Sequence, residues 1–104
     1  MELKIFWTES SEKELAKIFQ FYLDTVNLRI AEKVTDGIFN ATLILTQQPE
    51  MGQIEYFLMD RNEDFRYILY KNYKIIYWFN KEQNWIEIYD VFDMRQNPLN
   101  TKRI

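Results

Sequence analysis

The chain has 104 residues, contains neither histidine nor cysteine, and carries 13 basic against 16 acidic side chains, which gives a net charge of -3. The missing residue types exclude disulfides, thiolate nucleophiles, zinc sites built from cysteine or histidine, and any general-base scheme that relies on imidazole. The length suits one domain over residues 1–104, and a hydrophobic fraction of 47% with only two glycines and two prolines is typical of a folded globular domain.

The first elements expected along the chain are a short strand over residues 3–7 and a helix. The helix is indicated by an apolar stripe at the i, i+3, i+4, i+7 spacing of one helix face: Leu15, Ile18, Phe19 and Tyr22. Either Thr8 or Ser11 can cap its first backbone N–H groups, and Ser11 with Glu14 has the spacing of a capping box.

A second helix is predicted after a short break at residues 24–27. Its apolar residues recur every three or four positions, and Pro49 ends it no later than Gln47, because the residue before a proline avoids the helical region. Gly37 weakens this helix, so we expect it to mark a close approach between the two helices. Two helices joined by a short loop form an antiparallel hairpin.

The second half of the chain changes to a period of two, which indicates strands. Four runs rich in Ile, Tyr, Phe and Trp are expected to be strands, namely residues 54–59, 65–70, 74–80 and 85–92. Their short polar connectors predict an antiparallel meander. The fold class is therefore α+β, with the N-terminal strand and the helical hairpin packed on one face of an antiparallel sheet. The other face is the expected functional surface, and residues 93–104 are expected to end irregularly.

No segment of the sequence indicates a membrane or a targeting signal. The first eight residues are too charged for a signal-peptide core, and the longest aromatic-aliphatic run, residues 75–79, is far below the roughly 20 residues that span a bilayer. We expect a cytoplasmic protein without membrane contact. A metal site made of carboxylates alone stays open, but no spacing indicates one, so neither a metal nor a cofactor is expected.

Several ordered motifs carry a resemblance over nearly the whole chain. They are Phe6-Trp7-Thr8 before the first helix, Gln48-Pro49-Glu50-Met51-Gly52 after the second, Phe65-Arg66, Tyr73-Lys74-Ile75-Ile76-Tyr77, and the closing Arg95-Gln96-Asn97-Pro98. In this order they resemble toxins of the RelE/ParE superfamily, the toxin halves of type II toxin–antitoxin modules, also known as plasmid stabilization proteins.

The resemblance implies one fold with two different activities. RelE-like members cleave mRNA in the ribosomal A site, whereas ParE-like members poison DNA gyrase and lack the ribonuclease residues. Fold alone does not decide between them. The partners implied are a cognate antitoxin and either gyrase or the ribosome with its mRNA, in a homodimer or a toxin–antitoxin hetero-oligomer.

Two arginines are the main candidate site residues, because the RelE-like pattern has one on the third sheet strand and one after the last. Arg66 and Arg95 occupy these positions, and two guanidinium groups could hold a scissile phosphate and stabilise the charge of its transition state. Arg95 could instead pair with Asp90 or Asp93 in a purely structural role.

A ribonuclease also needs a proton acceptor and contacts to its substrate. Glu87 could act as the base, Tyr89 on the same strand face could stack a nucleotide, and Lys71 and Lys74 could attract phosphate. Each of the four could equally be an ordinary surface residue.

The composition favours the ParE-like activity over the ribonuclease. Histidine is absent, no tyrosine follows Tyr89, and residues 51–104 carry eight basic and eight acidic groups, without the basic surplus expected of an RNA-binding enzyme. We therefore expect a gyrase-directed, non-nucleolytic toxin. The alternatives are a metal-independent mRNA endonuclease and an attenuated member that mainly binds its antitoxin.

Overall fold

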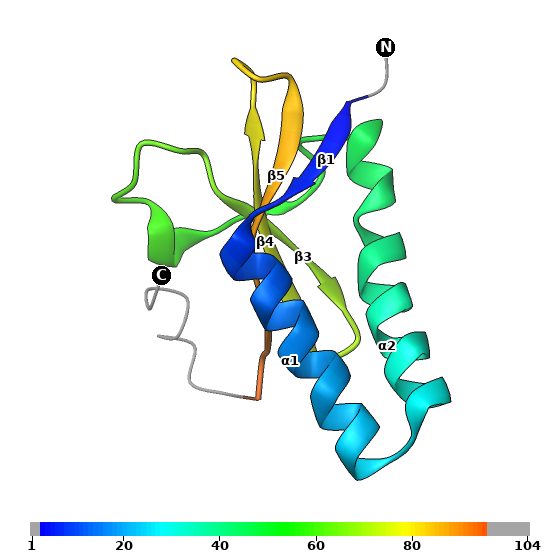
Figure 1. The fold of residues 1–104 in the computed structure, drawn as a ribbon. Coiled ribbons are helices and arrows are strands. Elements are labelled where there is room, and N and C mark those ends of the chain that lie inside the picture. Colours follow the sequence, from blue (N-terminus) through cyan, green and yellow to red (C-terminus); the bar gives the residue numbers. More distant parts are fainter. Residues whose placement is uncertain (1–2, 96–104) are drawn as a thin grey trace.

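The computed structural model describes residues 3–95 and confirms the α+β architecture (Figure 1). The helices are α1 (Glu9–Thr25) and α2 (Leu28–Ala41), followed by a 3₁₀ turn at Leu43–Thr46. The strands are β1 (Lys4–Trp7), β2 (Gln53–Ile54), β3 (Arg66–Tyr70), β4 (Tyr73–Asn80) and β5 (Trp85–Asp93). The irregular end predicted for residues 96–104 lies outside the described residues.

The sheet is mixed rather than fully antiparallel, which corrects one part of the predicted fold. Its order is β1-β5-β4-β3-β2, and β2 to β5 form the expected antiparallel meander, but β1 pairs with β5 in parallel. The first strand was expected on the sheet face with the helical hairpin, and it instead forms one edge of the sheet. This placement could not be predicted from turn lengths, because β1 and β5 are far apart in the chain. The helical hairpin carries the chain across one sheet face to the far edge, and the meander then returns it to β1 (Figure 1).

The run at residues 54–59 was predicted as a strand and is wrong beyond Ile54. Only Gln53 and Ile54 pair with β3, and a 3₁₀ turn follows at Tyr56–Leu58. The Glu55 carboxylate accepts a hydrogen bond from the Phe57 N–H at 3.1 Å, so the side chain competes with the ladder for this backbone. The buried positions recur every third residue instead of every second.

Local features of the helices also refine the predictions. Thr8, and not Ser11, is the N-cap of α1, and its hydroxyl accepts from the Ser11 N–H at 3.1 Å. Gly37 does not face the other helix, because a Cβ at this position would collide with the hydroxyl and ring of Tyr70 on β3. The glycine therefore permits a close approach between α2 and the sheet.

Each face of the sheet carries its own buried cluster. The helix-side cluster is the larger, and its fully buried members are Ile38, Leu45, Ile75, Tyr77, Ile86 and Ile88. On the opposite face Leu58, Phe65, Ile76 and Phe92 are buried together. Leu58 belongs to residues 51–64, which we call the strap, and it covers part of the face predicted to be open. The strap is the green segment that projects away from α2 in Figure 1.

Within residues 3–95, neither helix is both long and apolar enough to cross a bilayer.

Candidate functional site

The structure does not bring the two candidate arginines together. Arg66 begins β3 and pairs with Tyr77, whereas Arg95 follows the end of β5, where Asp93 pairs with Tyr73. Tyr73 and Tyr77 are four residues apart on β4, which corresponds to about 13 Å at roughly 3.3 Å per strand residue. The guanidinium groups therefore lie at opposite ends of the strand pair and do not share a phosphate site.

Arg66 is bound into the connection between α2 and β2. Its Nη1 donates hydrogen bonds to the carbonyl oxygens of Gly52 at 2.9 Å and Glu50 at 3.2 Å, and its Nη2 lies 3.5 Å from an Asp64 carboxylate oxygen. The Tyr77 hydroxyl accepts from the Gly52 N–H at 2.9 Å on the same link. Arg66 thus supports the link that ends the helical hairpin.

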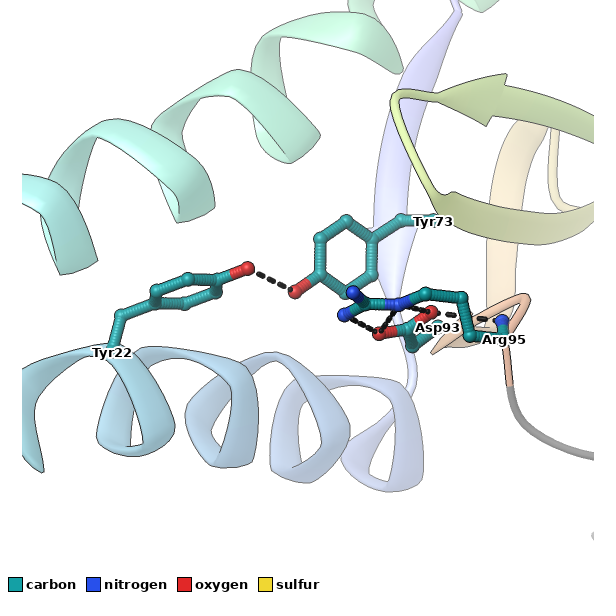
Figure 2. A network of polar contacts seen from close by, with 4 residues as sticks. All are labelled: Tyr22, Tyr73, Asp93 and Arg95. Carbon is teal, nitrogen blue, oxygen red and sulfur yellow. Dashed lines mark hydrogen bonds and ion pairs between the residues drawn. The ribbon is translucent and has the colours of Figure 1, made fainter. Parts of the chain in front are cut away.

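Arg95 forms a two-residue ion pair with Asp93, which is one of the structural alternatives considered from the sequence. The guanidinium Nε donates to both Asp93 carboxylate oxygens at 3.0 Å, and the Arg95 N–H donates at 2.9 Å (Figure 2). These hydrogen bonds lower the pKa of Asp93 to about 2, so this carboxylate is ionised at neutral pH. The Arg95 side chain is 72% exposed.

Two tyrosines lie beside this ion pair. The Tyr73 hydroxyl from β4 donates to the Tyr22 hydroxyl of α1 at 3.1 Å, as Figure 2 shows. Burial, followed by this hydrogen bond, raises the pKa of Tyr73 far above its usual range, so its phenol stays protonated. A hollow of about 240 Å³ here is bordered by Lys17, Phe21 and Arg95, among others. Its two exposed cations, Lys17 and Arg95, are each paired with a carboxylate, of Glu14 and Asp93 respectively.

Glu87 is engaged on both carboxylate oxygens. Trp78 Nε1 donates to Oε2 at 3.2 Å, and Trp85 Nε1 donates to Oε1 at 3.1 Å. Tyr89 packs its ring 4.5 Å from that of Phe65, between ring centroids. The register of β5 against β4 shifts at Tyr89, since Ile88 pairs with Tyr77 and Asp90 with Ile76, so Tyr89 is the extra residue of a bulge.

The two lysines are also placed in structural surroundings. Lys74 forms a buried ion pair with Glu55 of the strap, and its Nζ lies 4.2 Å from the centre of the Tyr67 ring. Lys71 occupies the β3–β4 turn with a φ of 52° and lies over the Tyr70 ring at 5.6 Å. Lys74 and Glu87 share the sheet face away from the helices but lie toward opposite ends of the β4–β5 pair, since Lys74 pairs with Phe92 and Glu87 with Trp78.

An apolar groove on the helical hairpin is the main surface feature that the sequence did not reveal. It has a volume of about 410 Å³, and its lining, which we call the helix groove, consists of Trp7, Glu12, Leu15, Ala16, Phe19, Thr35 and Phe39. The periodicity assigned Leu15 and Phe19 to the core, but both are only half-buried. The sequence did contain an indication of this groove, because α1 carries more large apolar residues than one core-facing stripe needs. The only fully buried residue of α1 is Ser11.

The helix groove is mainly apolar and includes the rings of Trp7 and Phe39. The Trp7 ring lies 6.3 Å from the Phe39 ring in a stacked arrangement, and Phe39 is 45% exposed. Trp7 Nε1 is buried and has no hydrogen-bond partner among residues 3–95. An apolar surface of this kind suits a protein segment that supplies apolar side chains.

Comparison with known proteins agrees with this geometry. Residues 5–98 match the family model described as ParE toxin of type II toxin-antitoxin system, parDE. Among solved structures, the chromosomal ParDE TA system from P. aeruginosa is similar, with a TM-score of 0.71 at 15% sequence identity, over 88% of this chain and 96% of that chain. At this identity the structural likeness shows the fold alone. Curated protein sequences give no significant match.

Proposed function

The chain belongs to the ParE toxin family of type II toxin–antitoxin systems, and we propose on this basis that it arrests growth by a gyrase-directed action that does not cleave RNA. We further propose that a cognate antitoxin neutralises it. Whether the target is gyrase or mRNA depends on which chemistry the surface residues can perform.

The separation of Arg66 from Arg95 is the observation that carries the non-nucleolytic proposal. A ribonuclease of the RelE-like kind would need both guanidinium groups at one phosphate. Here Arg66 supports the Glu50–Gly52 link and Arg95 is paired with Asp93. The remaining candidate base, Glu87, would have to give up two indole hydrogen bonds before it could accept a proton. These arrangements favour a toxin that acts by binding.

The helix groove is the proposed docking site of the antitoxin. Its half-buried apolar lining, with Phe39 45% exposed, is the kind of surface into which an amphipathic helix lays its apolar face. Burial of Leu15, Phe19 and Phe39 by a partner would remove from water the apolar area that the chain alone leaves exposed. Antitoxin binding would thus also make the toxin more soluble, because the free toxin exposes this apolar surface.

Expression of the chain alone in a bacterial host tests this proposal. Growth should stop, purified protein should inhibit DNA supercoiling by gyrase, and primer extension should find no translation-dependent cuts in mRNA. Cuts that depend on translation and vanish in Arg95→Ala and Glu87→Gln would instead establish the ribonuclease. Normal growth at good protein yield would favour an attenuated member that mainly binds its antitoxin.

Two groove variants test the antitoxin site separately. Phe19→Asp and Phe39→Asp each introduce a charge into the apolar lining. They should weaken antitoxin binding about tenfold or more, because replacing a central apolar anchor of an interface typically reduces the binding free energy by about 2 kcal/mol or more. Phe21→Asp is the matched control, since Phe21 is 56% exposed on α1 outside the groove lining. Equal effects of all three changes would remove the groove from the proposal.

A further inference from the structure

The strap is fixed to the sheet at intervals of three residues, by one backbone N–H and two side chains. The Gly52 N–H donates to the Tyr77 hydroxyl at 2.9 Å, Glu55 forms the buried ion pair with Lys74, and Leu58 is fully buried in the second cluster. The Glu55 N–H also donates to the Phe65 carbonyl oxygen at 2.9 Å. This part of the strap is consequently held in one conformation.

The outer side of the same segment presents large apolar side chains to solvent. They are Met51, Ile54, Tyr56, Phe57 and Met59, with exposed fractions between 37% and 72%. Scattered exposed apolar residues are normal on a protein surface, but several within nine residues mark an interaction site. Because the backbone beneath them is already ordered, a partner that binds here loses less conformational entropy than it would on a mobile loop.

Acidic side chains border these apolar residues. Glu63 and Asp64 line two hollows, of about 280 and 350 Å³, and the smaller one also includes Met59 and Arg61 of the strap. The larger hollow also contains Glu50 and Glu82, so four carboxylates there face only two cations. A partner surface with basic residues around an apolar anchor would complement this arrangement.

We propose that the strap is the surface by which this toxin docks on its target protein, and that the target contributes a basic surface with an apolar anchor. The proposal rests on the proposed function in assuming a protein target. Nucleic acid fits poorly, since its phosphates would meet the carboxylates. A symmetric second copy fits poorly too, because an isologous contact would place the two acidic borders against each other.

The strap and the helix groove lie on opposite sides of the sheet. The groove lies on the helix side of the sheet, whereas Leu58 anchors the strap on the opposite face. Changes in the strap should therefore reduce toxicity and leave antitoxin binding intact.

Strap variants with matched controls test the inference. Tyr56→Ser combined with Met59→Ser removes the two most exposed apolar side chains of the strap, and Glu63→Lys reverses one border charge. The controls are Val26→Ser, at a 55% exposed position in the α1–α2 connection, and Glu63→Gln. Growth arrest is measured against inducer dose, and the purified proteins are assayed for half-maximal gyrase inhibition, antitoxin affinity and oligomeric state, with a circular dichroism melt to establish folding.

We expect the double variant and Glu63→Lys to need about tenfold or more protein for the same growth arrest, with antitoxin affinity within about twofold of the parent and Val26→Ser unchanged. Undiminished arrest by folded strap variants would overturn the inference, as would a loss of antitoxin binding or the dissociation of a homodimer. Arrest by the parent chain without gyrase inhibition would refute the proposed target, while loss of arrest in the strap variants would still support the strap. A parent chain that arrests nothing would overturn both.

Discussion

The buried ion pair between Lys74 and Glu55 provides the most direct test of how the strap is held. The Glu55 side chain is 2% exposed and that of Lys74 is 14% exposed, so both charges are largely removed from water. The change Lys74→Met keeps the apolar stem and removes the ammonium group. It leaves the Glu55 carboxylate buried with only the Phe57 N–H, at 3.1 Å, among the hydrogen bonds that it accepts.

The expected loss follows from the burial of the pair. Removing one partner of a buried ion pair typically destabilises a protein by about 3–5 kcal/mol. Because Lys74 keeps some contact with water and Glu55 keeps its backbone hydrogen bond, we expect a loss at or just below the lower limit of this range, about 2–3 kcal/mol. For a domain of this size that corresponds to a decrease in Tm of roughly 10–20 °C.

Urea unfolding followed by tryptophan fluorescence measures the free energy of unfolding of each variant. The control is Lys13→Met, which removes the pair between Lys13 and Glu9, whose side chains are 71% and 85% exposed. An exposed i, i+4 pair contributes about 0.5 kcal/mol or less, so this variant should be close to the parent.

A double variant separates the pair from simple burial. Glu55→Leu with Lys74→Met should recover most of the stability lost by Lys74→Met alone, since an apolar replacement of both partners leaves no buried charge. If Lys74→Met costs no more than Lys13→Met, or if the double variant adds the two single losses, the strap is not held by this ion pair and our reasoning fails.

Two further effects are expected in the same unfolding assay. Tyr77→Phe should lower the free energy of unfolding by about 1–3 kcal/mol, because it leaves the buried Gly52 N–H without its acceptor. The control Tyr67→Phe removes an exposed hydrogen bond and should lower it by about 0.5 kcal/mol or less. Equal losses in the two variants would contradict the role of the Tyr77 hydroxyl. The pKa of Asp93 is lowered in the folded state from 3.8 to about 2, chiefly by Arg95, so its contribution is present above about pH 4 and lost as pH falls toward 2. Asp93→Asn should flatten the decline of stability across that pH window, and an unchanged slope would count against the pairing.

The order and type of most elements could be predicted because hydrophobic periodicity reflects burial directly. The stripe of Leu15, Ile18 and Tyr22 gave α1, and the alternating runs gave β3, β4 and β5. The prediction failed where a side chain competes with the backbone, as Glu55 does after Ile54. It also failed for β1, which was expected on the sheet face with the helices but forms a parallel edge strand through a pairing with β5 that no local pattern contains.

The candidate site was less predictable than the fold, because function depends on distances across the sheet. The family resemblance singled out Arg66 and Arg95 as candidate phosphate-binding residues. Their separation, however, follows from the register of β3, β4 and β5, which the sequence does not show. The apolar strap was hidden for a different reason. Its residues have strand-like composition, and only the fold reveals that Gly52, Glu55 and Leu58 are buried while the apolar residues between and beside them are exposed.

The distribution of surfaces places a constraint on how neutralisation works. The sheet face away from the helices is partly covered by Leu58. The helix groove includes the exposed Phe39, and the strap carries five exposed large apolar side chains. These two lie on opposite sides of the sheet. An antitoxin segment confined to the groove would leave the strap open to a target. If the two proposed surfaces are right, neutralisation would require either that the antitoxin extend around the sheet to the strap or that its bulk prevent the target from approaching. The length of antitoxin needed to abolish gyrase inhibition by the purified protein would distinguish these two arrangements.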